Sequence, residues 1–260
     1  MPTLPLRRTL WSLPIFRLRA KHKVRRRGAA LRLLVGMPPG RVLDAPCGEG
    51  LLARDLAGLG HEVWACDRDS TVFRDAAGIK FDLADLNARL PYPDDFFDAV
   101  FSLEGIEHLE TPAVCLGEFA RVLRPGGRLV LSTPNINNVQ SRWEYFLTGR
   151  FSGFKTLSRR ALERPDGDVH WHITAPYFPT LAFLMTGAGL KLNAIEVTMI
   201  KTRQWLLLPL AFPMWLAARR APCGTPARAL GSWKLLLGRS VIIRAVKSEG
   251  PEGDGTGGRS

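Results

Sequence analysis

The chain has 260 residues, of which 46% are hydrophobic and 23% are charged, and its formal net charge is +12. This composition is sufficient for one domain with a packed core, plus appendages. The four cysteines include no CxxC pair, and the N-terminus has no uninterrupted apolar stretch followed by a small-residue cleavage site. We therefore expect no disulfide framework, no zinc knuckle and no secretory signal peptide, and we expect a cytoplasmic location.

The charge is unevenly distributed along the chain. Residues 1–41 contain 11 Lys and Arg and no acidic residue, residues 42–196 contain 15 basic and 21 acidic residues, and residues 197–248 contain nine basic and no acidic residues. Two basic segments therefore flank an acidic middle, which favours a polyanionic partner, either nucleic acid or an anionic membrane surface. Alternatively, the basic residues bind no such partner and only form a solvated surface, in a chain whose composition favours arginine.

Short β-branched runs alternate with helical patterns through the middle of the chain, which predicts βαβ units and a parallel sheet. The expected strands are Arg41–Ala45, Glu62–Asp67, Ile79–Leu83, Phe97–Leu103, Arg128–Thr133, Leu190–Thr198 and Ser240–Lys247. Helices are expected to begin near Gly50 and after Asp69, and to span Pro112–Leu123 and Thr180–Thr186.

The remaining segments complete the predicted organisation. Residues 1–38 form a basic amphipathic segment, and residues 39–247 form the domain. Within the domain, a polar and aromatic loop covers residues 135–154 and an apolar insertion covers residues 201–238. Residues 248–260 are a Gly-rich tail that we expect to be disordered.

A glycine-rich turn, DAPCGEG at residues 44–50, joins the first predicted strand to the first helix. Such a turn lets a ligand approach the backbone at the carboxyl edge of the sheet. Its spacing also satisfies a GxGxxA dinucleotide fingerprint, and Asp67 could hold a ribose with either ligand. Asp44 and Glu49 disfavour a pyrophosphate and favour a ligand with ammonium and sulfonium groups. The alternative is that Asp44 and Asp67 bind no ligand and only cap helices or satisfy turns.

The order of the motifs resembles that of the class I S-adenosylmethionine-dependent methyltransferases over about residues 41–247. VLDAPCGEG, VWACDRD, FDLADLNARLPYPDDFFDAV, FSLEGIEHL and LRPGGRLVLSTPN are similar to five successive motifs of that family. The resemblance implies a Rossmann-like, three-layer αβα fold with a seven-stranded, mostly parallel sheet and an antiparallel last strand. It also implies that S-adenosyl-L-methionine is bound by Asp44, Cys47, Gly48, Glu49, Gly50, Asp67, Arg68, Asp85, Leu86 and Leu103.

The run ExxEH (Glu104, Glu107 and His108) ends the fourth strand, where an acceptor would meet the cofactor. Similar runs occur in ubiquinone-type O-methyltransferases and in small-RNA methyltransferases, where two carboxylates, a histidine and a later histidine bind a divalent metal. This resemblance implies Glu104, Glu107, His108 and His170 as metal ligands, with His172 as the alternative later histidine. A second interpretation makes His108 a direct general base together with Glu107. In a third, Glu107 and His108 only start a helix.

The apolar stretch QWLLLPLAFPMWLAARR, residues 204–220, lies between the last two predicted strands and therefore on the rim of the site. Trp205–Ala218 is shorter than the ~20 residues that a spanning helix needs, and Pro209 and Pro213 disfavour an uninterrupted helix. Its basic flanks and terminal tryptophans are typical of an interfacial element, as is the composition of residues 1–38. A buried hairpin or a dimer contact is the alternative.

These features lead to the hypothesis of a peripheral enzyme on the inner face of a membrane that O-methylates a small amphiphilic or lipid-linked acceptor. An RNA methyltransferase and a non-catalytic cofactor-binding partner protein are the alternatives. The predicted loop contributes four aromatic residues that we expect to line the acceptor pocket: Trp143, Tyr145, Phe151 and Phe154.

Overall fold

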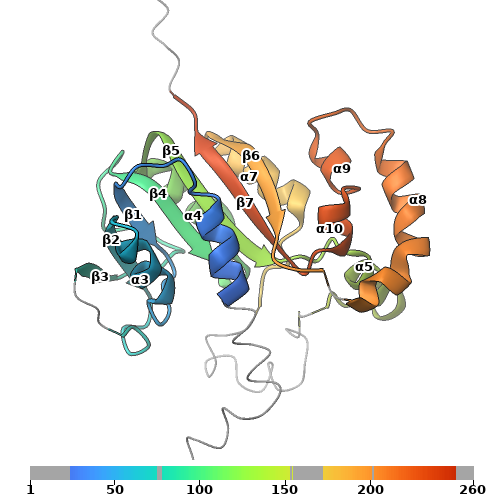
Figure 1. The fold of residues 1–260 in the computed structure, drawn as a ribbon, viewed down its shortest axis with the longest axis horizontal. Helices are drawn as coiled ribbons and strands as arrows, with labels where there is room; N and C mark the ends of the chain where they lie inside the picture. Colours follow the sequence, from blue (N-terminus) through green and yellow to red (C-terminus); the bar gives the residue numbers. More distant parts are fainter. Residues whose placement is uncertain (1–23, 75–77, 153, 155–171, 201, 250–260) are drawn as a thin grey trace, which may run out of the picture.

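The computed structural model describes residues 24–74, 78–152, 154, 172–200 and 202–249. A seven-stranded sheet in the order β3-β2-β1-β4-β5-β7-β6 forms the middle of three layers, with helices on both faces (Figure 1). Strand β7 runs antiparallel to both of its neighbours. The predicted α/β fold, with a mostly parallel sheet and an antiparallel last strand, is confirmed.

The strands are β1 (Arg41–Asp44), β2 (Glu62–Asp67), β3 (Ile79–Leu83), β4 (Phe97–Leu103), β5 (Leu123–Pro134), β6 (Leu190–Val197) and β7 (Ser240–Lys247). All pairs from β3 through β5 are parallel, so these strands end at one edge of the sheet. At that edge Pro134, the last residue of β5, pairs with Ser240, the first residue of β7. The connection that precedes β7 therefore emerges where ligands bind in sheets of this type.

Two hydrophobic clusters lie on the two faces of the sheet. Helix α3 (Leu51–Gly58) and the helical residues 24–32 pack on one face, and α4 (Pro112–Val122) and α7 (Phe178–Gly187) pack on the other. Adjacent residues of a strand point to opposite faces. Helices on both faces therefore bury most side chains of β1 and β4, including neighbours along the strand such as Val42 and Leu43, which explains the largely apolar sequences of these strands.

Two segments differ from the prediction. The described residues after Asp69 form turns instead of a helix, since Asp69 Oδ1 accepts the N–H and the hydroxyl of Thr71 at 2.9 and 2.6 Å. Such local bonds compete with a helix. Conversely, the predicted loop contains helix α5 (Val139–Thr148), which the Asn138 side chain caps and which Gly149 ends with a φ of 68°.

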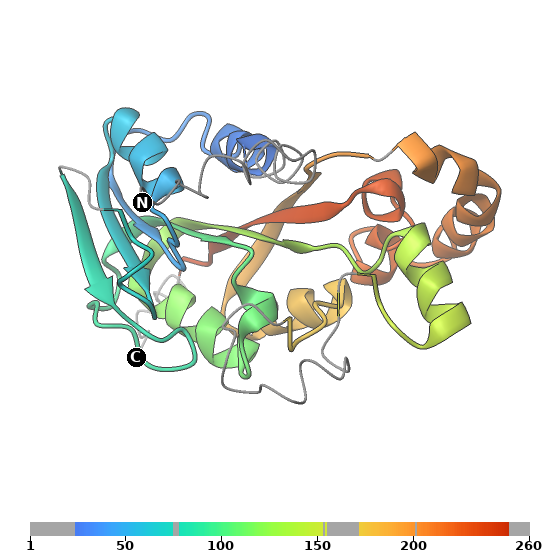
Figure 2. The same ribbon diagram turned by 90° about the horizontal axis from the view of Figure 1, so that it is seen from below.

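A second group of helices projects beyond one end of the main body (Figures 1 and 2). We call it the distal lobe, and it consists of α5, η2 (Thr202–Leu207), α8 (Leu208–Ala218), α9 (Pro226–Ala229) and α10 (Trp233–Leu237). The amide of Asn135, just beyond β5, donates to the carbonyls of Leu235 and Gly238 at 2.8 and 2.9 Å. The lobe is therefore hydrogen-bonded to the ligand-binding edge of the sheet.

Helix α8 continues through Pro213, contrary to the expectation that two prolines would interrupt it. Pro209 lies in the first turn, where a backbone N–H has no intrahelical partner. Pro213 then removes a single bond, to the carbonyl of Pro209. Among the described residues, no helix combines the length and the apolar character needed to cross a membrane.

Candidate functional site

The turn between β1 and α3 depends on two glycines. Gly48 and Gly50 have left-handed backbones, with φ of 51° and 72°, and glycine adopts this conformation without steric cost. A Cβ atom on Gly50 would also lie 2.7 Å from the ring of Phe73. Gly50 therefore shapes the turn and does not line the cavities described below.

Asp67 links this turn to the end of β2. Its Oδ2 atom accepts the N–H of Gly48 at 2.8 Å, and its Oδ1 atom accepts the N–H of Asp69 at 3.3 Å. Asp67 is 8% exposed and lines both cavities at this edge. The chain thus holds the carboxylate in place while its remaining lone pairs are open to a ligand.

Asp44, the last residue of β1, is buried and accepts the N–H of Ala53 at 3.1 Å. Burial raises the pKa of this carboxyl to about 8, although the bond from Ala53 opposes the shift. Asp44 lines one of the cavities. A cationic group bound there would favour the ionised carboxylate.

Two adjoining cavities, of about 280 and 300 Å³, open at this edge. Both are lined by the predicted residues Gly48, Glu49 and Asp67; the first is also lined by Arg68, Asp85 and Leu86, and the second by Asp44, Cys47 and Leu103. Burial raises the pKa of the Cys47 thiol, so this residue is a packed thiol and not a thiolate nucleophile. The structure brings together all the predicted cofactor residues except Gly50.

Arg26 and Arg27 also line the second cavity, and the sequence analysis missed them. It assigned them to a segment facing a membrane. Instead, Arg26 Nη2 lies 3.1 Å from Glu104 Oε2, and Arg27 Nε lies 2.7 Å from Asp55 Oδ2. The helical periodicity just after the arginine run could have indicated this packing. Residues 1–23, the rest of that prediction, lie outside the described residues.

Glu104 follows the end of β4 and has a φ of 57°, which is uncommon for a residue other than glycine. Its Oε1 atom accepts the hydroxyl of Ser132 at 3.3 Å. Burial raises the pKa of Glu104, and the neighbouring Arg26 opposes that shift. The left-handed turn directs the chain into η1 (Ile106–His108), which carries the rest of the motif.

Glu107 is fully buried in η1. The hydroxyl of Thr133 donates to its Oε2 atom at 3.0 Å, whereas Oε1 has no hydrogen-bond partner among the described residues. Burial raises its pKa well above the usual value, and Glu104 raises it further. The backbone carbonyl of Glu107 accepts the N–H of Ile173 at 2.9 Å, which brings His172 to η1.

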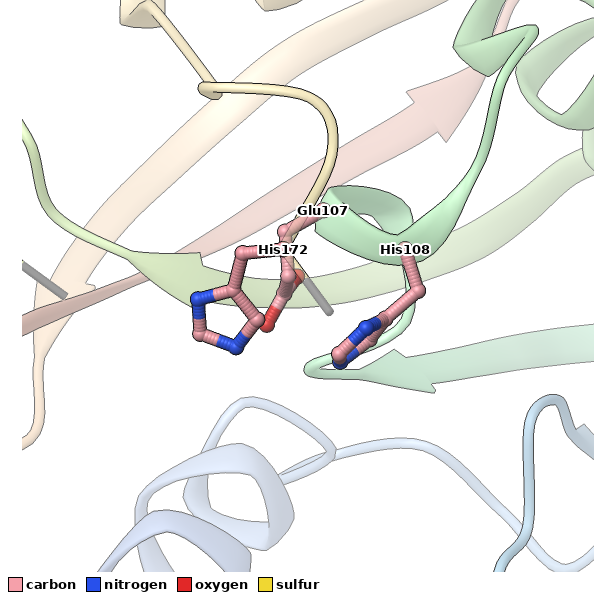
Figure 3. A group of neighbouring side chains, drawn as sticks. All are labelled: Glu107, His108 and His172. Carbon is pink, nitrogen blue, oxygen red and sulfur yellow. The ribbon is translucent and has the colours of Figure 1, made fainter. Parts of the chain in front are cut away.

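Glu107, His108 and His172 form a group in which one ligand atom of each residue lies within 4.8 Å of the others (Figure 3). One carboxylate and two imidazoles suit a divalent transition metal, and a metal would give the buried Glu107 Oε1 a partner. The predicted set is corrected in part. Glu104 is not in the group because it pairs with Arg26, and His170 lies outside the described residues.

A third cavity, of about 200 Å³, adjoins this group. Its lining includes Glu104 and His172 as well as Arg26, Gln140, Gln204 and Arg239. His108 lines the first of the two cavities predicted for the cofactor. His108 and His172 of this group therefore line two different cavities, one predicted for the cofactor and the other a polar chamber.

The lining of this chamber includes none of the four aromatic residues predicted for the acceptor pocket, although Phe154 contacts His172, which does line it. Phe154 lies against His172 with ring centroids 5.1 Å apart. Trp143 and Tyr145 are exposed on α5, where Tyr145 stacks on Phe151, and neither lines any of the three cavities. The prediction failed because α5 turns these side chains away from the sheet edge.

Residues 43–131 match the family model described as "Methyltransferase domain". Residues 43–131 therefore belong to a methyltransferase domain. This stretch of the methyltransferase domain includes the glycine turn, Asp67, Asp85 and the Glu107–His108 pair.

Curated relatives match part of the chain. A ubiquinone biosynthesis O-methyltransferase of Xylella fastidiosa (strain M23) is 38% identical over 112 residues, covering 39% of this chain and 44% of that protein. A demethylmenaquinone methyltransferase of Beutenbergia cavernae is 35% identical over 127 residues, covering 46% of this chain and 53% of that protein. The matched region thus spans about half the length of these relatives.

Solved structures resemble a larger part of the chain. A putative methyltransferase from Bacillus halodurans has a TM-score of 0.55 at 16% identity, covering 86% of this chain and 99% of that one. Haemonchus contortus phosphoethanolamine N-methyltransferase 2, in complex with S-adenosyl-L-methionine, has a TM-score of 0.53 at 17% identity. The match covers 86% of this chain and 52% of that one. These similarities establish the fold of the methyltransferase domain.

Gly105 tests how closely the two loops of the site approach each other. A Cβ atom there would lie 2.4 Å from Pro46 Cδ, so we expect Gly105→Ala to displace Pro46. Such overpacking costs about 1–3 kcal/mol, and we expect a lower melting temperature together with weaker cofactor binding in titration calorimetry. Gly117→Ala on α4 is the matched control, since a Cβ there meets no atom within 4 Å. Equal melting temperatures for the two variants would contradict the expectation.

Proposed function

We propose that this protein transfers the methyl group of S-adenosyl-L-methionine to an oxygen of a small amphiphilic or lipid-linked acceptor. One observation carries the proposal: His108 lines a predicted cofactor cavity, and His172 of the same group lines the polar chamber. An acceptor in the chamber would meet the cofactor at these side chains. The names of the curated relatives, which are quinone-pathway methyltransferases, support an acceptor of this class.

The reaction is an in-line displacement. The acceptor oxygen attacks the methyl carbon, the carbon–sulfur bond breaks, and the hydroxyl proton passes to a base while S-adenosylhomocysteine leaves. The enzyme therefore has to align the two reactants and to accept one proton. His108 and Glu107 are the candidate bases within the group, and burial together with the neighbouring Glu104 raises the pKa of Glu107 above its usual value.

A divalent metal held by Glu107, His108 and His172 fits the same proposal. Bound there, it would lower the pKa of the acceptor hydroxyl. The chain would still supply alignment, through the polar chamber, and shielding from water, through the packing of Phe154 against His172. Direct base catalysis and metal-assisted catalysis therefore use the same side chains.

A labelling experiment tests the proposed function. The purified protein would be incubated with methyl-tritiated cofactor and either a lipid extract or an RNA extract. We expect label in the lipid extract, with equivalent release of S-adenosylhomocysteine. Label in RNA would support an RNA methyltransferase instead. Cofactor binding without product in either extract would support a non-catalytic cofactor-binding protein.

Cofactor binding should also release a proton. The ammonium group of the cofactor would favour ionised Asp44, whose pKa in the free protein is raised to about 8 by burial. Below that pH the carboxyl must lose its proton on binding, so affinity should rise by up to about tenfold per pH unit and level off above pH 8. Calorimetry at pH 6.5 in two buffers with different protonation enthalpies measures the proton released. Asp44→Asn should abolish the release, and no release from the unsubstituted chain would contradict the prediction.

A further inference from the structure

Helix α8 is apolar on every side but is not buried. Its sequence, LPLAFPMWLAA, has no polar side chain, and Ala211 is its only buried residue. A helix that is hydrophobic all round normally lies in a protein core or in a membrane. At 11 residues it is about 16 Å long, which is half of the ~30 Å hydrocarbon thickness of a bilayer.

The inner side of α8 is held by the distal lobe itself. Ala211 packs in a small cluster with Val139 of α5 and with Leu236 and Leu237 of α10. Within the part of the chain that the structure describes, the outer side is left exposed: Phe212 is 55% exposed and Leu216 is 49% exposed. The preceding turn, η2, adds Leu206, which is 82% exposed. The lobe therefore has a core on one side of α8 and an apolar surface on the other.

Helix α5 adds a second apolar surface to the same lobe. Trp143, Phe146 and Leu147 lie at i, i+3 and i+4 and therefore share one face of the helix. All three are exposed, and the rings of Trp143 and Phe146 stack at 5.7 Å. Helix α5 packs against η2. The exposed residues of the two elements therefore belong to one end of the molecule (Figure 2).

The charges on the lobe indicate which partner this surface fits. Residues 202–238 of the lobe contain five basic and no acidic residues, and α5 contains one of each. Arg219 and Arg220 are exposed at the end of α8, and the guanidinium of Arg219 lies 4.8 Å from the ring centroid of Trp215. Trp215 in turn stacks on Trp233 of α10. Apolar side chains with tryptophan and arginine at their border are typical of segments that bind the interface of an anionic bilayer.

We propose that the distal lobe docks on an anionic lipid bilayer, with α5, η2 and α8 inserted among the head groups. Insertion to the usual depth of about 5–10 Å would bury the exposed side chains of these elements. Asn135 connects the lobe to the end of β5, so docking would hold the polar chamber close to the membrane surface. This inference deepens the proposed function by naming the surface where the acceptor is met, but docking itself requires no methyl transfer.

Vesicle co-sedimentation of the full chain tests the docking surface. The vesicles are phosphatidylcholine alone or phosphatidylcholine mixed with phosphatidylglycerol. We expect binding to the anionic vesicles only, and weaker binding in 1 M salt because the Debye length falls to about 3 Å. Phe146→Ser and Leu206→Ser should each weaken binding roughly tenfold, since each removes a large apolar side chain from the lipid.

Phe183→Ser is the matched control. Phe183 is 77% exposed, but it lies on α7, outside the distal lobe, so vesicle binding should be unchanged. Equal effects of Phe183→Ser and Phe146→Ser, or no binding to anionic vesicles, would overturn the proposal. A dimer in light scattering that Phe146→Ser dissociates would also overturn it, because the lobe would then contact a second chain. Cofactor titration without vesicles tests the methyltransferase proposal separately.

Discussion

Replacing Asp67 with alanine is expected to weaken S-adenosyl-L-methionine binding roughly 100-fold. The carboxylate fixes the glycine turn through the N–H of Gly48 at 2.8 Å, and its free lone pairs are predicted to accept the ribose hydroxyls. Hydrogen bonds to a charged group contribute about 1.5–3 kcal/mol each, and about 1.4 kcal/mol corresponds to a tenfold change in affinity. The loss of two such bonds would produce this effect, and titration calorimetry with the cofactor measures it directly.

A control on the same strand separates this role from a general effect on β2. Glu62 begins the strand, and its carboxylate lies 2.7 Å from Lys80 Nζ on the surface. Exposed ion pairs contribute at most about 1 kcal/mol, so Glu62→Gln should bind the cofactor normally. Unchanged affinity in a folded Asp67→Ala variant would show that Asp67 only stabilises the turn, which is the alternative that the sequence analysis left open.

Replacing Glu107 with glutamine should reduce turnover about 1000-fold while leaving cofactor affinity unchanged. Glutamine keeps the size of the side chain and an oxygen that can accept the hydroxyl of Thr133, but it has no carboxyl group that could exchange a proton with the acceptor. Loss of a positioned base usually costs about 10²–10⁴-fold in rate. The measurement is S-adenosylhomocysteine release at saturating acceptor, together with cofactor titration.

Glu110→Gln provides the matched control, because Glu110 lies three residues further along the chain and is exposed. It should retain full turnover. Dialysis against a chelator then separates the two catalytic interpretations. Loss of activity that added manganese restores would identify the group as a metal site, and unchanged activity would leave Glu107 and His108 as direct bases. A fully active Glu107→Gln variant would contradict both the metal-assisted and the direct-base interpretation.

Local pattern predicted which acidic residues gather at the edge of the sheet where the cofactor is expected. Asp44 and Asp67 are the last residues of β1 and β2, Asp85 comes two residues after β3, and the carboxyl ends of parallel strands meet at one edge. Their neighbourhood is therefore set by the order of strands and turns along the chain. The segment after Asp69 was predicted less well because short hydrogen bonds to Thr71 replaced the expected helix.

The acceptor half depended on contacts between distant segments. Arg26 reaches Glu104 because the helical residues 24–32 pack beside the sheet, and His172 reaches η1 through a backbone bond from Ile173 to Glu107. Helical periodicity indicates that residues 24–32 pack on the sheet but not which side chains they meet, and the pairing of His172 with η1 has no periodic signal in the sequence. Residues far apart along the chain meet only where packing brings their elements together.

The sequence by itself determined the fold class, the glycine turn and the acids at the strand ends, since these follow from local periodicity and from turn chemistry. It also determined that the stretch around Trp205–Ala218 is too short to span a bilayer. Only the tertiary structure decided that α8 remains on the surface, that α5 turns its aromatic face outwards beside it, and that His172 joins Glu107 and His108. The physical reason is that burial is a property of the whole packed chain, whereas periodicity records only which side of an element is apolar.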